Sequence, residues 1–253
     1  IAVALSWKAP IVAYGAVALT CVTAWAIFGR NKKHVAEVVS GPDGAPAAVA
    51  EPKVTLGQAL TQRSTLLLAF AVLGNWCLGN AIGSWLPTYY NEVFKMPLEK
   101  ASAITAVITA AGTVACLVGG VISMRTGRRK PLIIISGLFM GVSAMGAVLF
   151  NTPWIIFLAV AAFGAFSNIQ TPTLFTIPME LENVPPRTGA VIINAMQSVG
   201  TVGAFGGPLI VGYLTDMTGS YLPGFIICAV LSFSMLVAGL LLPETGPAAR
   251  HAE

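Results

Sequence analysis

The stretch that decides the fold is Gly120-Val-Ile-Ser-Met-Arg-Thr-Gly-Arg-Arg-Lys130, which ends with four basic residues in six positions. Uncharged, mostly apolar runs flank the basic turn, residues 101–124 before it and 131–150 after it. A charged side chain at the bilayer centre costs roughly 2.5–3.5 kcal/mol on insertion scales. The basic turn therefore lies at a membrane surface, and Lys and Arg favour the cytoplasmic surface.

The composition of the whole chain agrees with a membrane location. Its 253 residues are 56% hydrophobic and 9% charged, and the mean hydropathy is +0.80, whereas soluble domains have about 25% charged residues. The basic residues behind the net charge of +4 lie in segments beside apolar runs. We therefore expect them to contact lipid headgroups, and we expect no nucleic acid partner. The four cysteines lie in separate apolar stretches, which favours buried thiols over disulfides or a metal site.

Seven apolar stretches are long enough to cross a bilayer, which takes about 20 residues. Runs of this length form helices, because barrel strands would alternate over about ten residues. We predict an all-α integral membrane protein, a polytopic bundle of seven transmembrane helices at residues 9–28, 66–90, 101–124, 131–150, 153–178, 189–215 and 221–242.

The domain organisation follows from the spacing of these spans. The first helix, within residues 1–28, is separated from the others by residues 29–65, whose centre is rich in Pro, Gly and Ala and typical of a flexible linker. The remaining six spans, residues 66–242, are joined by short loops and predict one compact bundle, and residues 243–253 form a tail. The chain begins without Met or a signal peptide, and we expect it to be a fragment of a longer protein.

The basic residues also predict the orientation. Eleven of the 14 Lys and Arg residues fall on the side of the linker, the 125–130 loop, the 179–188 loop and the tail. The other three are Lys8, Lys95 and Lys100. The richer side is expected to be cytoplasmic.

Several motifs resemble those of the major facilitator superfamily. Its loop motif is G-x-L-(A/S)-D-(R/K)-x-G-R-(R/K); Met124 stands where the family often has Asp, and the matching residues are Gly120, Ser123, Arg125, Gly127, Arg128 and Arg129. Four further segments are similar to family motifs at the ends of spans: residues 7–8, 182–189, 208–220 and 242–246.

The resemblance implies that the seven helices are spans six to twelve of a twelve-span transporter, with residues 66–242 as the C-terminal six-helix half. It implies secondary active transport of a small organic solute by alternating access in the plasma (inner) membrane, without a cofactor. The partners would be the solute, the membrane lipids and the missing N-terminal half. The sequence of residues 85–90 is similar to that of permeases for small organic anions.

The resemblance also implies a cytoplasmic gate. In the family the basic loop latches this gate, which here would use Gly120, Arg125, Gly127, Arg128 and Arg129. The physical pattern agrees, because a cation and a glycine suit the last turn and the left-handed cap of a helix. The next cytoplasmic loop adds the candidate gate residues Glu180, Glu182 and Arg187. The alternative for all of these charges is a positive-inside anchor and solvated loop residues.

The spans carry neutral polar groups and no Asp, Glu, Lys, Arg or His near their middle. Amides in a span are costly unless they bond to another helix, water or a solute, so some should line a solute pathway. Our candidates are Asn75, Asn80, Asn168, Gln170, Asn194 and Gln197, within a wider set that includes Trp76, Thr171, Thr173 and Ser198. The alternative is interhelical hydrogen bonding. If the protein couples to protons, the carrier would lie in the other half.

Enzyme chemistry is not indicated. The sequence has no Gly-Lys pair for a P-loop, and His34 and His251 lack the spacing of metal ligands. The rival from another functional class is a non-transporting membrane sensor or scaffold with the same fold.

Overall fold

The computed structural model describes residues 8–28, 57, 61–181 and 186–246. The chain divides into two units, residues 1–50 and 51–253. The described part of the first unit is one helix, α1 (Lys8–Phe28), with an apolar stretch at Tyr14–Ile27. Thr20 and Thr23 donate their hydroxyls to carbonyl oxygens one turn earlier, at 2.8 and 2.7 Å. Apart from the hydroxyl of Tyr14, these are the only side-chain hydroxyls of that stretch. Their hydrogen bonds within the helix make it suited to an apolar surrounding.

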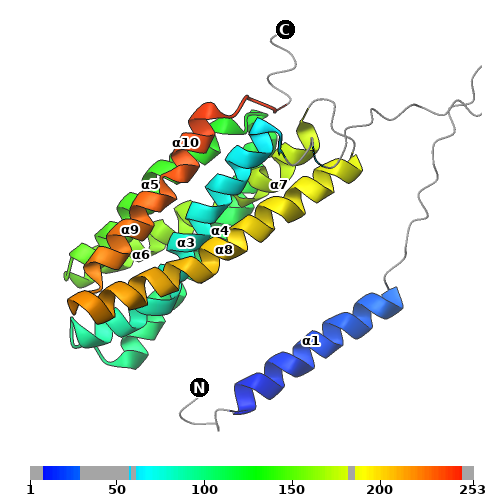
Figure 1. Ribbon diagram of the computed structural model, residues 1–253. Helices are drawn as coiled ribbons and strands as arrows, with labels where there is room; N and C mark the ends of the chain where they lie inside the picture. Colours follow the sequence, from blue (N-terminus) through cyan, green and yellow to red (C-terminus); the bar gives the residue numbers. More distant parts are fainter. Residues whose placement is uncertain (1–7, 29–56, 58–60, 182–185, 247–253) are drawn as a thin grey trace, which may run out of the picture. The chain divides into compact units, whose positions relative to one another are not determined.

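The second unit is a bundle of antiparallel helices (Figure 1). α3 packs extensively against α8, and α6 lies against both α4 and α5. The helices are α3 (Arg63–Glu92), α4 (Leu98–Thr126), α5 (Lys130–Leu149), α6 (Pro153–Asn168), α7 (Thr171–Glu180), α8 (Pro186–Thr218), α9 (Leu222–Ser232) and α10 (Ser234–Leu241).

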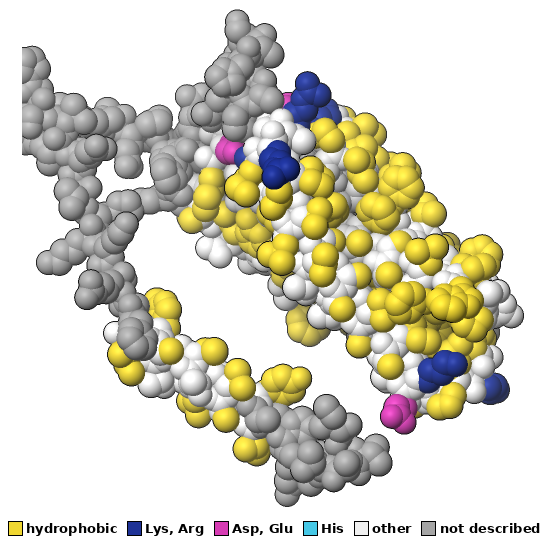
Figure 2. Space-filling view, turned by 180° about the vertical axis from the view of Figure 1, so that it is seen from behind, with side chains coloured by type: hydrophobic (Ala, Val, Ile, Leu, Met, Phe, Trp, Pro, Cys, Tyr) yellow, Lys and Arg dark blue, Asp and Glu magenta, His cyan; other side chains and the backbone are white. Residues whose placement is uncertain are grey.

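Six stretches of this unit are long and apolar enough to cross a membrane, with α6–α7 and α9–α10 each counted as one stretch. This confirms six of the predicted spans, and each begins and ends within three residues of its predicted bounds. Figure 2 shows charged side chains at the two ends of the visible face of the bundle, with a hydrophobic belt between them. The predicted linker falls mostly on residues outside the described ranges, as does the tail after residue 246.

Two of the spans contain breaks. The span predicted at 153–178 is divided at residues 169–170, just before Pro172. The span predicted at 221–242 is divided at Phe233, where Ser232 donates its hydroxyl to the carbonyl oxygen of Ala229 at 2.7 Å. A serine that bonds back to its own helix in this way commonly bends it. α8, in contrast, runs unbroken through Pro208.

Glycines set the close contact between α3 and α8. A Cβ placed on Gly203 or Gly207 of α8 would overlap the carbonyl oxygens of Leu73 or Cys77 of α3. This pair behaves as a close-packing GxxxG motif. The similar pair at Gly79 and Gly83 meets nothing within 4 Å, so that face of α3 stays open.

The end of the bundle away from the basic loop is closed by aromatic residues. Tyr89 and Tyr90 of α3 each donate a hydroxyl to one of the last carbonyl oxygens of α5, both at 2.8 Å. Tyr221, just before α9, donates to the Glu92 carboxylate at 2.7 Å. These bonds pair polar groups at the helix ends and join α3, α5 and α9.

Candidate functional site

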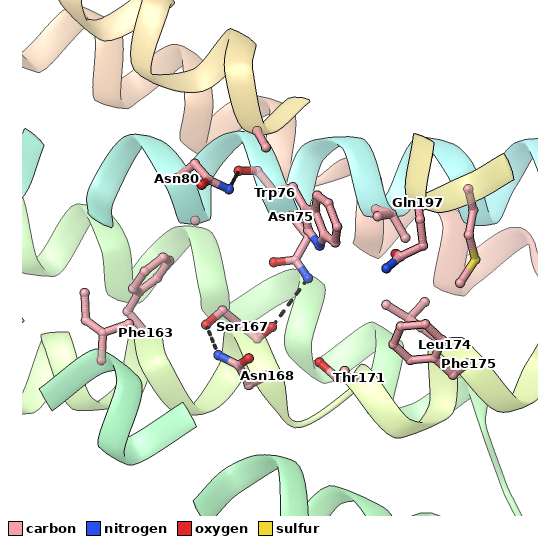
Figure 3. A pocket seen from close by; sticks show the side chains of 15 residues that line it. Asn75, Trp76, Asn80, Phe163, Ser167, Asn168, Thr171, Leu174, Phe175 and Gln197 are labelled. Carbon is pink, nitrogen blue, oxygen red and sulfur yellow. Dashed lines mark hydrogen bonds between the residues drawn. The ribbon is translucent and has the colours of Figure 1, made fainter. Parts of the chain in front are cut away.

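A cavity of about 500 Å³ lies between α3, α6, α7 and α8 (Figure 3). None of the described residues that line it is ionisable, and the wall combines apolar side chains with neutral hydrogen-bonding groups. The polar members are Asn75, Trp76, Asn80, Ser167, Asn168, Thr171 and Gln197. Such a neutral polar surface is costly in a membrane helix bundle and is therefore a candidate for solute contact.

The break between α6 and α7 forms the polar side of the cavity. Pro172 has no N–H, so the carbonyl oxygen of Asn168 cannot receive its helical hydrogen bond. Side chains bond the neighbouring carbonyl: the Ser167 oxygen accepts from Nδ2 of Asn75 at 3.4 Å and from Nε2 of Gln170 at 2.7 Å. The last carbonyl oxygens of α6 are thus bonded in part by side-chain amides, one from the break itself and one from α3.

Asn168 is held tightly at this break. Its Nδ2 donates to the carbonyl oxygen of Gly164 and to Oγ of Ser167, both at 3.0 Å. A Cβ on Gly112 of α4 would lie 2.6 Å from the same nitrogen, so glycine leaves room for this amide. Asn168 also borders a second cavity of about 410 Å³ on the α4 side. The side chain therefore stands between two hollows of the bundle.

The opposite wall comes from α3 and α8. Asn80 donates Nδ2 to the carbonyl oxygen of Trp76, one turn earlier on α3, at 3.0 Å. Gly79 lies beside them and opens the wall, because it has no side chain and no near neighbour. Gln197 of α8 points toward α7 from the other side (Figure 3). Amides from three helices thus surround one space.

An ion pair with two hydrogen bonds lies at the basic end of the bundle. Arg129 donates Nε and Nη2 to the two oxygens of Glu180 at 3.0 and 2.6 Å. Its Nη1 donates to the carbonyl oxygen of Ser123 at 2.9 Å and to the hydroxyl of the same residue. That hydroxyl is 3.2 Å from Oγ1 of Thr173. Arg129 thus ties the end of α4 to α7, and its hydrogen bond with Glu180 raises the pKa of the guanidinium.

Glu244, in the segment after α10, caps the same place. Its Oε1 accepts the backbone N–H of Arg129 at 2.6 Å, and its Oε2 accepts that of Lys130 at 3.3 Å. These donors begin α5, and a carboxylate is favourable at a helix N-terminus. Lys130 in turn donates Nζ to the carbonyl oxygen of Leu240 at 2.8 Å. The C-terminal segment, the basic loop and α7 therefore form one hydrogen-bonded cluster.

The family model of the Major Facilitator Superfamily matches residues 1–182. The match covers more than half of the 253 residues. The chain belongs to the major facilitator superfamily. This confirms the resemblance drawn from the basic loop, and the helical bundle agrees with it.

Three relatives from this superfamily are transporters of organic acids by name. The chain is 26% identical to the probable sulfoacetate transporter of Cupriavidus necator, over 96% of the chain and 59% of the relative. It is 26% identical to the hexuronate transporter of Bacillus subtilis, over 100% of the chain and 62% of the relative. It is 24% identical to the probable galactarate/D-glucarate transporter of Escherichia coli, over 87% of the chain and 53% of the relative. The chain thus spans 53–62% of the length of these relatives.

The facilitator bundle brings together four of the six predicted pathway residues: Asn75, Asn80, Asn168 and Gln197 line the cavity. Gln170 is fully buried at the break, and its Oε1 has no hydrogen-bond partner among the described residues. Asn194 is exposed on α8 outside this lining. The sequence reasoning missed Ser167, whose only signal was its position directly before Asn168 and five residues before Pro172.

The predicted gate residues divide in a similar way. Gly127 is the left-handed cap of α4, with φ of 59°, as the sequence predicts. Gly120 faces Pro172. The side chains of Arg125 and Arg128 are exposed. Arg129 and Glu180 form the ion pair, so one candidate acid lies against the basic loop. Glu182 lies outside the described residues, and Arg187 lies in α8 with an undescribed side chain. Glu244 was missed.

Proposed function

We propose that the chain forms one half of a secondary transporter that carries small organic anions across the plasma membrane by alternating access. The observation that carries this proposal is the neutral polar cavity of about 500 Å³ inside an apolar bundle. Superfamily membership and relatives named for sulfoacetate, hexuronate and galactarate/glucarate support it.

Alternating access assigns a complementary half to this chain. In such transporters the solute site lies near the midplane between two repeats that rock against each other. The exposed face of α3 at Asn80 and Gly83 continues from the cavity wall, and the chain spans only part of its relatives. We expect the complementary half to cover this face and close the site.

The cluster of Arg129, Glu180 and Glu244 is our candidate for part of the cytoplasmic gate. It joins three segments that are far apart in the sequence, and it lies at the end of the bundle with the basic loop. From the positive-inside rule we expect that end to face the cytoplasm, together with the linker and the C-terminal tail. Exposed Arg125 and Arg128 remain available for anionic lipid headgroups or for the other half.

Uptake into vesicles tests the proposal. The chain is produced alone, and in parallel together with the complementary half, and the purified protein is placed in lipid vesicles. We expect saturable uptake of a labelled organic acid only when both halves are present. Ligand binding without any uptake or counterflow would contradict the proposal and favour a sensor, whereas saturable uptake by the monomeric chain alone would refute the division into two halves.

A further inference from the structure

The hydrogen bonds around the cavity fix which way its amides face. An asparagine amide has a nitrogen that only donates and an oxygen that only accepts. Asn75, Asn80 and Asn168 each bond a backbone carbonyl oxygen, at 3.4, 3.0 and 3.0 Å respectively. Because a carbonyl oxygen only accepts, the amide nitrogen must be the partner in all three cases. The carbonyl partner therefore fixes which atom of each amide is the nitrogen and which is the oxygen.

This orientation leaves acceptors on the cavity wall. One N–H of each amide is used by a backbone carbonyl oxygen, and Asn168 donates its second N–H to Oγ of Ser167 (Figure 3). Asn75 and Asn80 each keep a second N–H beside the acceptor oxygen of the same amide. Within the described part of the chain, the Oδ1 atoms of these three residues have no hydrogen-bond partner. Those of Asn75 and Asn168 are not sealed from solvent, and Asn80 is an exposed residue. All three residues line the same cavity. The wall thus presents a group of fixed hydrogen-bond acceptors.

Fixed acceptors select the part of a solute that can donate. Carboxylate and sulfonate groups only accept hydrogen bonds, so three amide oxygens offer them nothing, and no Lys, Arg or His is among the described residues of the lining. A hydroxyl group donates one hydrogen bond and accepts others. Trp76, Thr171 and Gln197 on the same lining carry the donors that would complete its bonds.

We propose that this wall binds the hydroxyl groups of a polyhydroxylated organic acid, and that the acid groups are bound by the complementary half. The inference rests on the proposed transport function and narrows its substrate class. It favours hydroxylated acids, such as the galactarate named for one relative, over sulfoacetate, named for another, which has no hydroxyl. A site built to bond a hydroxyl rejects the analogue without it, because its polar groups are then left unpaired.

Galactarate and adipate test this directly, since both are six-carbon diacids and adipate lacks the four hydroxyls. Labelled galactarate uptake by the two-half protein in vesicles is inhibited with unlabelled galactarate, adipate or sulfoacetate. We expect adipate and sulfoacetate to be at least about tenfold weaker inhibitors, the effect of one good hydrogen bond. Equal inhibition by galactarate and adipate, or uptake of sulfoacetate without galactarate, would overturn the inference and leave the transport function intact. Absence of uptake for every acid would instead refute the proposed function.

Variants connect the preference to the wall. Asn80→Ala removes one acceptor oxygen from the wall. The hydrogen bond that the structure shows for this side chain is donated by Nδ2 within its own helix, so the bundle should fold. This variant should weaken inhibition by galactarate about tenfold and leave inhibition by adipate unchanged. The difference between the two inhibitors should therefore become smaller. Asn91→Ala is the matched control, because Asn91 bonds Met96 at the far end of α3, outside the cavity lining. If Asn80→Ala and Asn168→Ala both leave the preference for galactarate over adipate unaltered, the hydroxyl groups are not bound by this wall.

Discussion

Glu180→Gln breaks the ion pair at the basic end and keeps the shape of the side chain. The side chains of Arg129 and Glu180 are 9% and 19% exposed, so the pair is shielded from water on most sides. Removal of one partner from a buried pair costs about 3–5 kcal/mol, because the remaining charge is left uncompensated. Glu244 remains close to Arg129, so we expect the lower limit, about 3 kcal/mol.

Thermal unfolding of the purified chain in detergent measures this loss. For 150–250 residues, 1 kcal/mol shifts Tm by about 2–4 °C, which predicts a fall of about 6–12 °C. A thiol-reactive dye reports unfolding once exposed Cys21 and half-buried Cys116 are replaced by Ser in every variant, because Cys77 and Cys228 are buried in the folded bundle. Glu99→Gln is the matched control, since Glu99 is exposed in the first turn of α4 at the other end.

A double variant checks that the effect comes from the pair. Arg129→Gln with Glu180→Gln removes both charges, so its loss of stability should be smaller than the sum of the two single losses. The reasoning is refuted if Glu180→Gln lowers Tm no more than Glu99→Gln does, or if the two single losses simply add.

The remaining predictions concern topology, the amides and pH. Cysteines placed at Ser40 and Asn151 should label with an impermeant reagent from opposite sides of the membrane; labelling from one side would refute the topology. Asn168→Ala should weaken solute affinity about tenfold and also lower Tm, since it loses two hydrogen bonds, whereas Asn194→Ala, exposed on α8, should leave Tm unchanged. Burial, with the hydrogen bond to Glu92, raises the pKa of Tyr221 to about 12. The stabilisation of the fold by protonated Tyr221 is therefore complete below pH about 10 and is lost as pH rises to about 12. Tyr221→Phe should make Tm depend less on pH across that window, which unfolding curves measured there check.

Hydropathy was sufficient to predict the spans because length and apolar composition are local properties of the sequence. The cap at Gly127 was predictable for the same reason, since a glycine after a basic last turn is a local signal. Pro172 indicates a bend, because a proline frees a helical carbonyl. The replacement bonds from Asn75 and Gln170 depend on how α3 packs against α6, and that packing has no local signal.

The candidate site shows the same limit. Amides in apolar spans pointed to the cavity because an unpaired amide is costly there, but the sequence did not separate Gln197 from Asn194. The rotation of α8 decides between them, and close packing of Gly203 and Gly207 on α3 sets that rotation. Glu244 was missed because its partner Arg129 lies 115 residues earlier in the chain.

The two parts of the candidate site are joined by α7. Thr171 at its first turn lines the cavity, and Glu180 at its last turn holds Arg129. A ten-residue helix is about 15 Å long, and α7 is separated from α6 by a turn rather than by continuous helical bonds. We expect movement of this short helix to change the cavity wall and the ion pair together. Because such coupling is reciprocal, a solute that favours one position of α7 would also favour one state of the proposed gate, and opening that gate would alter solute affinity by the same factor.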